Sequence, residues 1–271
     1  MPLSLFFIFL LGLGVGSFLN CVIYRLEKKE SFLFGRSYCP HCKHNLGFFD
    51  LIPLLSFFIL RGKCRYCQKP ISWQYPLVEI FTGLLFLLIF NFQSPIFNQF
   101  SIFNFQHLLV TGYWLLVTCF LIIIFVYDLK HYIIPDKVIY PAILVSGIWY
   151  FVSSIFFHSY TRYEILNTIY SALGAGLFFF LIVLISRGKW MGVGDIKLAF
   201  LMGLLLGFPK ILVALFSAFL FGAIIGIGLI ILKKKTIKSE VPFGPFLVTG
   251  TFIAIFFGEN VINWYLNFLA I

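Results

Sequence analysis

The chain is a series of long apolar runs separated by short polar stretches, and most runs have the length of a membrane-spanning helix. A helix needs roughly 20 mostly apolar residues to cross the hydrocarbon of a bilayer. Eight runs approach this length, at about 3–23, 76–92, 107–127, 138–157, 164–186, 195–208, 211–232 and 244–268. The second and sixth are short, and the sixth either begins earlier, near Trp190, or crosses only part of the bilayer. The pattern predicts an all-α integral membrane protein with about eight transmembrane helices.

Composition agrees with a membrane environment. Of the 271 residues, 61% are apolar by type and only 11% are charged, too few charges to cover a soluble core of this size. The formal net charge is +10, from 20 basic and 10 acidic residues. A basic excess in a membrane protein normally lies on the cytoplasmic side, so this charge gives no reason to expect a nucleic-acid partner.

The basic residues also predict an orientation. All of the 20 except Arg162 and Lys210 fall on one side of the predicted spans, with nine of them in residues 24–75. The positive-inside rule therefore places residues 24–75 in the cytoplasm and both termini outside. No basic residue precedes the first apolar run, so residues 1–23 are expected to be a permanent anchor rather than a removed signal peptide. Residues 76–271 then form a polytopic membrane domain.

Two C-x-x-C pairs stand in the polar segment 24–75, "CPHC" at 39–42 and "CRYC" at 64–67. Two such turns, each offering two thiolates, can close a tetrahedral zinc site. Reduced thiols without metal, or a redox pair, are the alternatives. A site closed by Cys39, Cys42, Cys64 and Cys67 has no open coordination position, so its expected role is structural. His41 and His44 are expected to be loop residues, and Cys21 and Cys119 small apolar residues in helices.

Two aspartates stand where predicted helices meet the same side of the membrane. Asp128 ends the third helix in "FVYDLKHYIIPD", and Asp195 begins the sixth in "MGVGDIK". A close pair of carboxyl groups shares a proton, so that one acts as base toward water and the other as acid. Interfacial charge, a helix cap at Asp195, and an ion or proton path remain alternatives.

Several neighbours bear on this pair. Gly192 and Gly194 carry no side chains, so an extended substrate backbone can approach closely, and they let a loop turn into a helix near Asp195. Lys197 either modulates the charge of Asp195 or extends to the membrane interface. Asp136, after Pro135, is expected to be a cap or turn residue at the start of the fourth helix.

Six motifs in order resemble the type IV prepilin peptidases, GxGD-type aspartic proteases of bacterial membranes. They are "GSFLNCVIYRL" (16–26), "RSYCPHCKHNL" (36–46), "DLIPLLSFFILRGKCRYCQKPISWQYPLVE" (50–79), "YDLKHYIIPD" (127–136), "GVGDIKLAF" (192–200) and "VPFGPFL" (241–247). One stretch departs from the family, which usually follows "YRL" with proline and a short loop, whereas this chain has "LEKKESFLFG".

The resemblance implies an enzyme of the inner membrane that cleaves the basic leader of type IV prepilins or type II secretion pseudopilins at the cytoplasmic face. Many members also N-methylate the new N-terminus with S-adenosyl-L-methionine. Asp128 and Asp195 match the family's catalytic aspartates, and the four cysteines match its zinc-binding motif in the segment associated with methylation. Glu79, in "YPLVE", matches a family motif. It is expected to bind a basic leader, to contribute to methylation, or only to begin a helix.

Two functions of other classes compete with this reading. A proton- or cation-coupled transporter would use the same aspartates, but it would be expected to show acidic groups near mid-bilayer, broken helices and repeats. A zinc-bearing adaptor without catalysis would leave the aspartates unexplained. The substrate pilin, the S-adenosyl-L-methionine site and the oligomeric state are not predicted by any motif.

Overall fold

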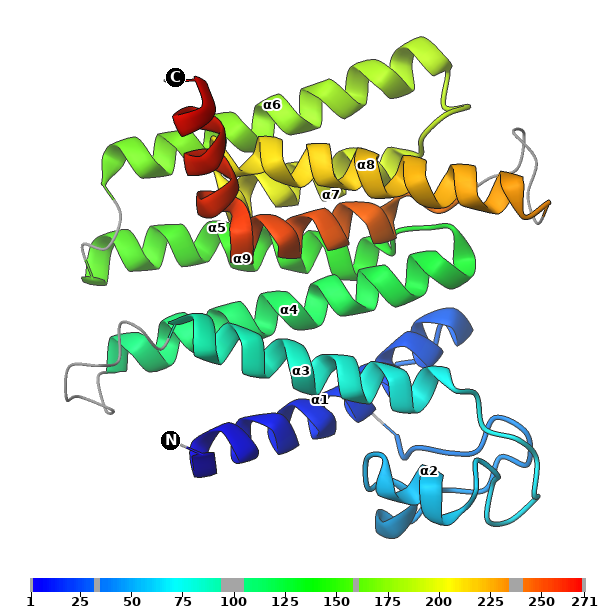
Figure 1. The fold of residues 1–271 in the computed structure, drawn as a ribbon. Helices are drawn as coiled ribbons and strands as arrows, with labels where there is room; N and C mark the ends of the chain where they lie inside the picture. Colours follow the sequence, from blue (N-terminus) through cyan, green and yellow to red (C-terminus); the bar gives the residue numbers. More distant parts are fainter. Residues whose placement is uncertain (1, 32–34, 94–104, 158–160, 234–240, 270–271) are drawn as a thin grey trace. The chain divides into compact units, whose positions relative to one another are not determined.

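The computed structural model describes residues 2–31, 35–93, 105–157, 161–233 and 241–269, and the regular structure within them is helical apart from two isolated β-bridges (Figure 1). Seven helices in this part of the chain are long and apolar enough to cross a membrane. They are α1 (Pro2–Lys28), α3 (Gln74–Gln93), α4 (Phe105–His131), α5 (Asp136–Phe157), α6 (Arg162–Ser186), α8 (Lys210–Ile231) and α9 (Gly244–Leu269). The predicted all-α membrane class is confirmed.

The predicted sixth span corresponds to α7 (Val193–Leu206), which has 14 residues and is not among these seven. It begins at Val193 rather than near Trp190, and it ends because Gly207 takes a positive φ of 65° just before Phe208-Pro209. Asn167 of α6 closes this end: its side chain donates to the Phe208 carbonyl (2.8 Å) and accepts from the Phe208 amide (3.3 Å). Three lysines of the predicted basic run, Lys234, Lys235 and Lys238, lie outside the described residues.

The chain forms two compact units, Met1–Ile123 and Ile124–Ile271. In the first unit, α1 and α3 pack antiparallel and very closely. A Cβ added to Gly12 would lie 2.7 Å from the Gly83 Cα, and one added to Gly16 would lie 2.7 Å from the Glu79 Cα. Glycine at both positions is therefore needed for the approach. The same register brings the Asn20 side-chain amide to the Tyr75 carbonyl (3.0 Å).

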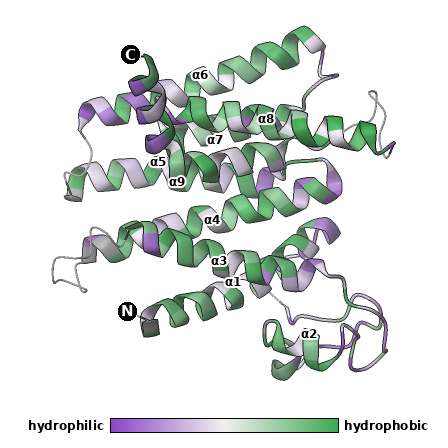
Figure 2. Ribbon diagram, in the orientation of Figure 1, coloured by the Kyte–Doolittle hydropathy of each residue, from purple (hydrophilic) through white to green (hydrophobic). Residues whose placement is uncertain are grey.

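The segment between α1 and α3 holds a short 3-10 helix, η1 (Phe48–Asp50), and a five-residue helix, α2 (Leu55–Ile59). Figure 2 shows hydrophilic residues gathered in this segment and near helix ends, while the long helices are mostly hydrophobic. This contrast is the one expected for helices in lipid joined by segments in water.

In the second unit, α7 packs against α5, α6, α8 and α9. Its Leu198, Ala199 and Met202 are fully buried. Gly203 lies against the Ala172 backbone of α6, so that a Cβ there would overlap it. The Tyr150 hydroxyl of α5 donates to the Leu204 carbonyl (2.7 Å). These contacts hold α7 as a rigid support for the residues at its N-terminus.

Candidate active site and cysteine cluster

Asp128 lies in the last turn of α4, three residues before the helix ends at His131. Tyr132, with a φ of 58°, turns the chain out of the helix, and its amide donates to the Asp128 carbonyl (2.9 Å). Pro135 then precedes the start of α5 at Asp136, as the sequence predicts. The Asp128 residue is only 3% exposed, so its carboxyl group must find its polar partners within the protein.

The Asp128 carboxyl group is hydrogen-bonded to the backbone of Gly244, 116 residues further along the chain. The Gly244 amide, at the start of α9, donates to Asp128 Oδ2 at 3.0 Å in a buried hydrogen bond. The first amides of a helix have no partner within the helix and carry partial positive charge, so a carboxylate suits them. A Cβ on Gly244 would lie 2.5 Å from Asp128 Oδ2, which leaves no room for a larger residue. Gly244 belongs to the motif "VPFGPFL", but nothing in that pattern predicts its contact with Asp128.

Asp195 is the third residue of α7 and is 8% exposed. Its Oδ2 accepts the Gly192 amide at 3.0 Å, which closes the turn that leads into the helix. This bond supports the expectation that the glycines let a loop turn into a helix near Asp195. The same bond caps the N-terminus of α7, which is the alternative role considered for Asp195. The other carboxylate oxygen, Oδ1, is not used in this cap.

The two carboxyl groups lie in the same unit and close enough for the charge on Asp128 to act on Asp195. In the described part of the chain, neither forms a salt bridge with lysine or arginine. Two buried carboxyl groups without a cation nearby cannot both be ionised cheaply.

Gly192 and Gly194 differ in their surroundings. A Cβ on Gly194 would lie 3.0 Å from the Ile134 Cβ, so this glycine has a packing reason: it admits the α4–α5 turn beside α7. A Cβ on Gly192 would meet nothing nearer than 3.8 Å, and Gly192 is exposed. Of the two, Gly192 offers the open backbone that an extended substrate would need.

Lys197 is engaged by residues other than Asp195. Its Nζ lies 2.6 Å from Asp136 Oδ1 and 4.8 Å from the centre of the Tyr140 ring, both on α5. Asp136 therefore begins α5, as predicted, and also binds the one lysine nearest to the GxGD motif.

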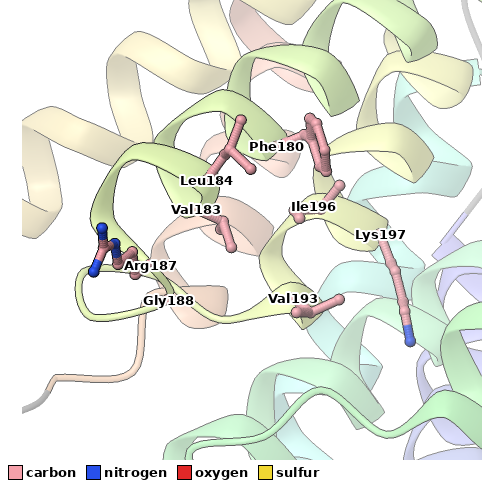
Figure 3. Close-up of a pocket in the computed structure, with 8 residues that line it drawn as sticks. All are labelled: Phe180, Val183, Leu184, Arg187, Gly188, Val193, Ile196 and Lys197. Carbon is pink, nitrogen blue, oxygen red and sulfur yellow. The ribbon is translucent and has the colours of Figure 1, made fainter.

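A pocket of about 610 Å³ lies between the end of α6 and the start of α7 (Figure 3). Its wall is apolar, with Arg187 and Lys197 at its edges; Val193, Ile196 and Lys197 are the α7 residues that line it. Neither Asp128 nor Asp195 is among its lining residues. The pocket therefore does not contain the carboxyl pair.

The four predicted cysteine ligands come together in the first unit. All four sulfurs of Cys39, Cys42, Cys64 and Cys67 lie within 4.8 Å of one another, and the Cys39 and Cys67 sulfurs are 3.9 Å apart. Zinc bonded to four sulfurs at about 2.3 Å would place them roughly 3.8 Å from one another. The cluster is thus slightly wider than a zinc site and fits one after a small contraction. His41 and His44 are not part of it.

The two halves of the cluster repeat one backbone design. The amide of Cys39 donates to the His44 carbonyl, and the amide of Cys64 to the Lys69 carbonyl, both at 2.9 Å. Lys43 and Gln68, each just after the second cysteine of its pair, have φ values of 61° and 58°. Each turn ends in an isolated bridge, Tyr38 to Asn45 and Lys63 to Pro70. Two equivalent turns presenting paired thiols are the framework of a zinc knuckle.

The thiols share their protons unequally. Burial raises the pKa of Cys39, but the amides of Cys42 and His41 donate to it and bring the pKa down to about 7. The Lys69 amide lowers the pKa of Cys67, yet burial and hydrogen bonds to the other three thiols raise it to about 11. One sulfur of the cluster is thus readily a thiolate, the form that binds metal.

Glu79, in the second turn of α3, is buried and connects two parts of the first unit. It is 7% exposed, and its Oε2 accepts the Leu54 amide at 2.9 Å. The Ser17 hydroxyl of α1 also bonds to it. Glu79 therefore ties the cysteine-bearing segment to the α1–α3 pair.

Two ranges of the chain match models of known protein families. Residues 10–92 match the family described as "Bacterial Peptidase A24 N-terminal domain", and residues 115–227 match the "Type IV leader peptidase family". The first match contains the cysteine cluster and Glu79, and the second contains both buried aspartates. No solved structure matched the chain.

Curated relatives match over nearly the whole length. A protein of Aeromonas hydrophila named prepilin leader peptidase/N-methyltransferase is 33% identical, covering 97% of this chain and 94% of the relative. Relatives with the same name from Legionella pneumophila and Pseudomonas aeruginosa are 31% and 28% identical, each over 96% of this chain and over 93% and 92% of the relative.

The chain belongs to the type IV leader peptidase family. It is a multi-pass membrane enzyme of the peptidase class, and the names of its relatives support a second activity as a methyltransferase. The alternative of a membrane transporter finds no support in these matches.

Proposed function

We propose that the protein is an aspartic endopeptidase that cleaves the leader of type IV prepilins or pseudopilins, with Asp128 and Asp195 activating water. The observation that carries this proposal is the pair of buried carboxyl groups at the ends of α4 and α7. Each has one oxygen on a backbone amide, Gly244 or Gly192, and no salt bridge in the described residues. Each carboxyl group keeps its second oxygen for water, substrate or the shared proton.

The reaction follows from that arrangement. The ionised carboxylate takes a proton from water, and the water oxygen attacks the carbonyl carbon of the scissile bond. The protonated partner donates a hydrogen bond to the carbonyl oxygen as negative charge develops there. The carbon–nitrogen bond then breaks, and the leaving amine takes a proton from the pair. The proton is held by the two groups jointly, so its titration belongs to the pair.

Substrate geometry fits this site. A prepilin is a transmembrane helix with a basic cytoplasmic leader, so its scissile bond lies at the inner surface of the bilayer. We place residues 24–75 and the aspartate pair on this side of the inner membrane because most basic residues lie there. The backbone of Gly192 is exposed and adjoins Asp195, so an unwound segment of the substrate can lie along it.

The second activity, methylation of the new N-terminus, is assigned to the N-terminal unit. Zinc held by Cys39, Cys42, Cys64 and Cys67 has a structural role there, since four thiolates leave it no open position. S-adenosyl-L-methionine supplies the methyl group when bound, and no residue of the chain is assigned to its site.

The decisive experiment compares three aspartate-to-asparagine variants in a cleavage assay. The purified protein in detergent is mixed with a prepilin, and the mature product is followed by mass spectrometry. Asp128→Asn and Asp195→Asn each abolish cleavage, because asparagine has no carboxyl group to share a proton. Asp136→Asn is the matched control, since it is at the same membrane face and exposed, and it retains most activity.

Two outcomes would overturn the proposal: cleavage by either of the first two variants, or no cleavage by the unmodified protein. Addition of S-adenosyl-L-methionine to the same mixture tests the second activity. The product then gains the mass of one methyl group at its N-terminal residue.

A further inference from the structure

The cysteine-bearing segment exposes large apolar side chains that its role as a zinc-holding module does not explain. On α2, Leu55, Phe58 and Ile59 are spaced i, i+3 and i+4 and therefore share one face of the helix. They are 60%, 62% and 74% exposed, while Phe57 on the opposite face is buried. We call Leu55, Phe58 and Ile59 the α2 face. A cytoplasmic segment that offers three such side chains to water would be costly to keep exposed.

The depth of α2 follows from its attachment to α3. The Leu54 amide, just before α2, donates to Glu79, and Glu79 is five residues inside the membrane-spanning range Gln74–Phe92. At 1.5 Å per residue this places the start of α2 beside a point about 7.5 Å along α3 from Gln74, the first residue of that range. Since the first turns of a membrane-spanning helix are near the bilayer surface, this point on α3 corresponds to the level of the lipid headgroups and upper acyl chains.

The residues next to α2 are of the types that are common where a protein meets the membrane surface, namely tryptophan and basic residues. Trp73, 65% exposed, packs against Phe57 with ring centres 5.0 Å apart, immediately before α3 begins. Tryptophan is enriched at this level of membrane proteins. Two cations, Arg61 and Lys63, follow α2 within four residues and are exposed. Of the two acids near this helix, Asp50 is paired with Arg65 at 2.8 Å, and Glu79 is buried.

We propose that the α2 face inserts into the adjacent membrane leaflet and that Arg61 and Lys63 bind the headgroups of anionic phospholipids there. The segment is tethered to the membrane at both ends by α1 and α3, so insertion adds apolar burial without loss of translational freedom. The insertion fixes the height of the zinc cluster above the bilayer, since Cys64 follows Ile59 by five residues. This inference does not depend on the peptidase activity or on which side of the membrane the segment lies.

The test uses the full chain, loaded with zinc, in nanodiscs of phosphatidylcholine and phosphatidylglycerol in equal amounts. Phe58 is replaced by 4-fluorophenylalanine, a nearly isosteric probe for fluorine NMR. Line broadening is measured with a nitroxide carried on the lipid and, separately, with a gadolinium chelate dissolved in water. The same probe at Phe57, buried on the same helix, and at Phe81, exposed within the α3 span, provides the two references.

Insertion predicts that the lipid nitroxide broadens the Phe58 signal to a similar extent as that of Phe81, while the water-soluble agent has little effect. Broadening of Phe58 mainly by the agent in water would overturn the proposal, because the face would then be solvated. Protection of Phe58 from both agents, as expected for Phe57, would also overturn it, because another part of the protein would then cover the face.

A separate experiment tests the binding of anionic lipid headgroups by Arg61 and Lys63. Replacement of phosphatidylglycerol by phosphatidylcholine, or the double change Arg61→Gln and Lys63→Gln, should shift the balance from inserted to withdrawn by about fivefold per cation. High salt should reproduce this shift, because it screens surface charge. An unchanged ratio of lipid to water broadening in all three conditions would show that the headgroup charge plays no part.

Discussion

Replacement of Gly244 by alanine should impair the peptidase by disturbing Asp128 without removing it. The new Cβ would lie 2.5 Å from Asp128 Oδ2 and 3.1 Å from its Cγ, well inside van der Waals contact. The carboxyl group or the start of α9 must therefore move, and the 3.0 Å hydrogen bond from the Gly244 amide is stretched or lost. A hydrogen bond to a charged group contributes about 1.5–3 kcal/mol.

That range sets the size of the effect. If the bond holds Asp128 in the geometry of the transition state, its loss lowers kcat by about 10- to 100-fold. KM should change little, because Gly244 is buried behind the carboxyl group and has no contact with the substrate in the mechanism proposed. Steady-state cleavage of a prepilin peptide, with kcat and KM separated, measures both quantities.

Gly222→Ala is the matched control. Its added Cβ would meet Phe243 and Phe246 at 3.5 Å, an ordinary contact beside the same turn, so activity should be retained. Melting temperatures of both variants separate misplacement from unfolding. A Gly244→Ala protein with normal kcat, or one whose loss is matched by a collapse in melting temperature, would refute the reasoning.

Three further changes test other parts of the structure. Cys39→Ser should reduce bound zinc to background, measured by elemental analysis, whereas Cys21→Ser should leave it near one ion per chain because that thiol is outside the cluster. Gly203→Val should destabilise the α6–α7 packing by about 1–3 kcal/mol or more, seen as a lower melting temperature, whereas Gly174→Ala on α6, with open space around it, should not. Glu79→Ala should leave the Leu54 amide without its acceptor, at a cost of about 1–3 kcal/mol, and speed proteolysis within residues 48–59; unchanged proteolysis would contradict the link.

The sequence predicted those features that depend on local pattern. Membrane helices follow from runs of apolar residues, and the zinc framework from the C-x-x-C spacing, because both are short-range. The paired aspartates could be placed at a common depth because positive charges define the sides of the membrane. Their mutual influence could only be stated as a hypothesis from the sequence, since no pattern in one chain measures the distance between two helices.

What the sequence did not reveal depends on contacts between distant residues. The Gly244 amide meets Asp128 across 116 residues, and Lys197 pairs with Asp136 across 61. A backbone donor leaves no side-chain pattern, so Gly244 carried only the weak indication of a glycine before a proline. The role of Gly194 was also hidden in the sequence, where it is only part of the motif beside Asp195. Its contact with Ile134 shows that it is needed for packing.

The short length of α7 has a consequence for where the chemistry takes place. Fourteen residues rise about 21 Å, some 9 Å less than a bilayer's hydrocarbon core. Asn167, which holds the far end of α7 at Phe208, is five residues inside α6, or about 7.5 Å below the start of that span. The missing length is thus almost entirely at the end remote from Asp195. In the mechanism that we propose, the carboxyl pair would therefore lie close to the aqueous boundary, where water and a newly formed, charged N-terminus can enter and leave without crossing hydrocarbon.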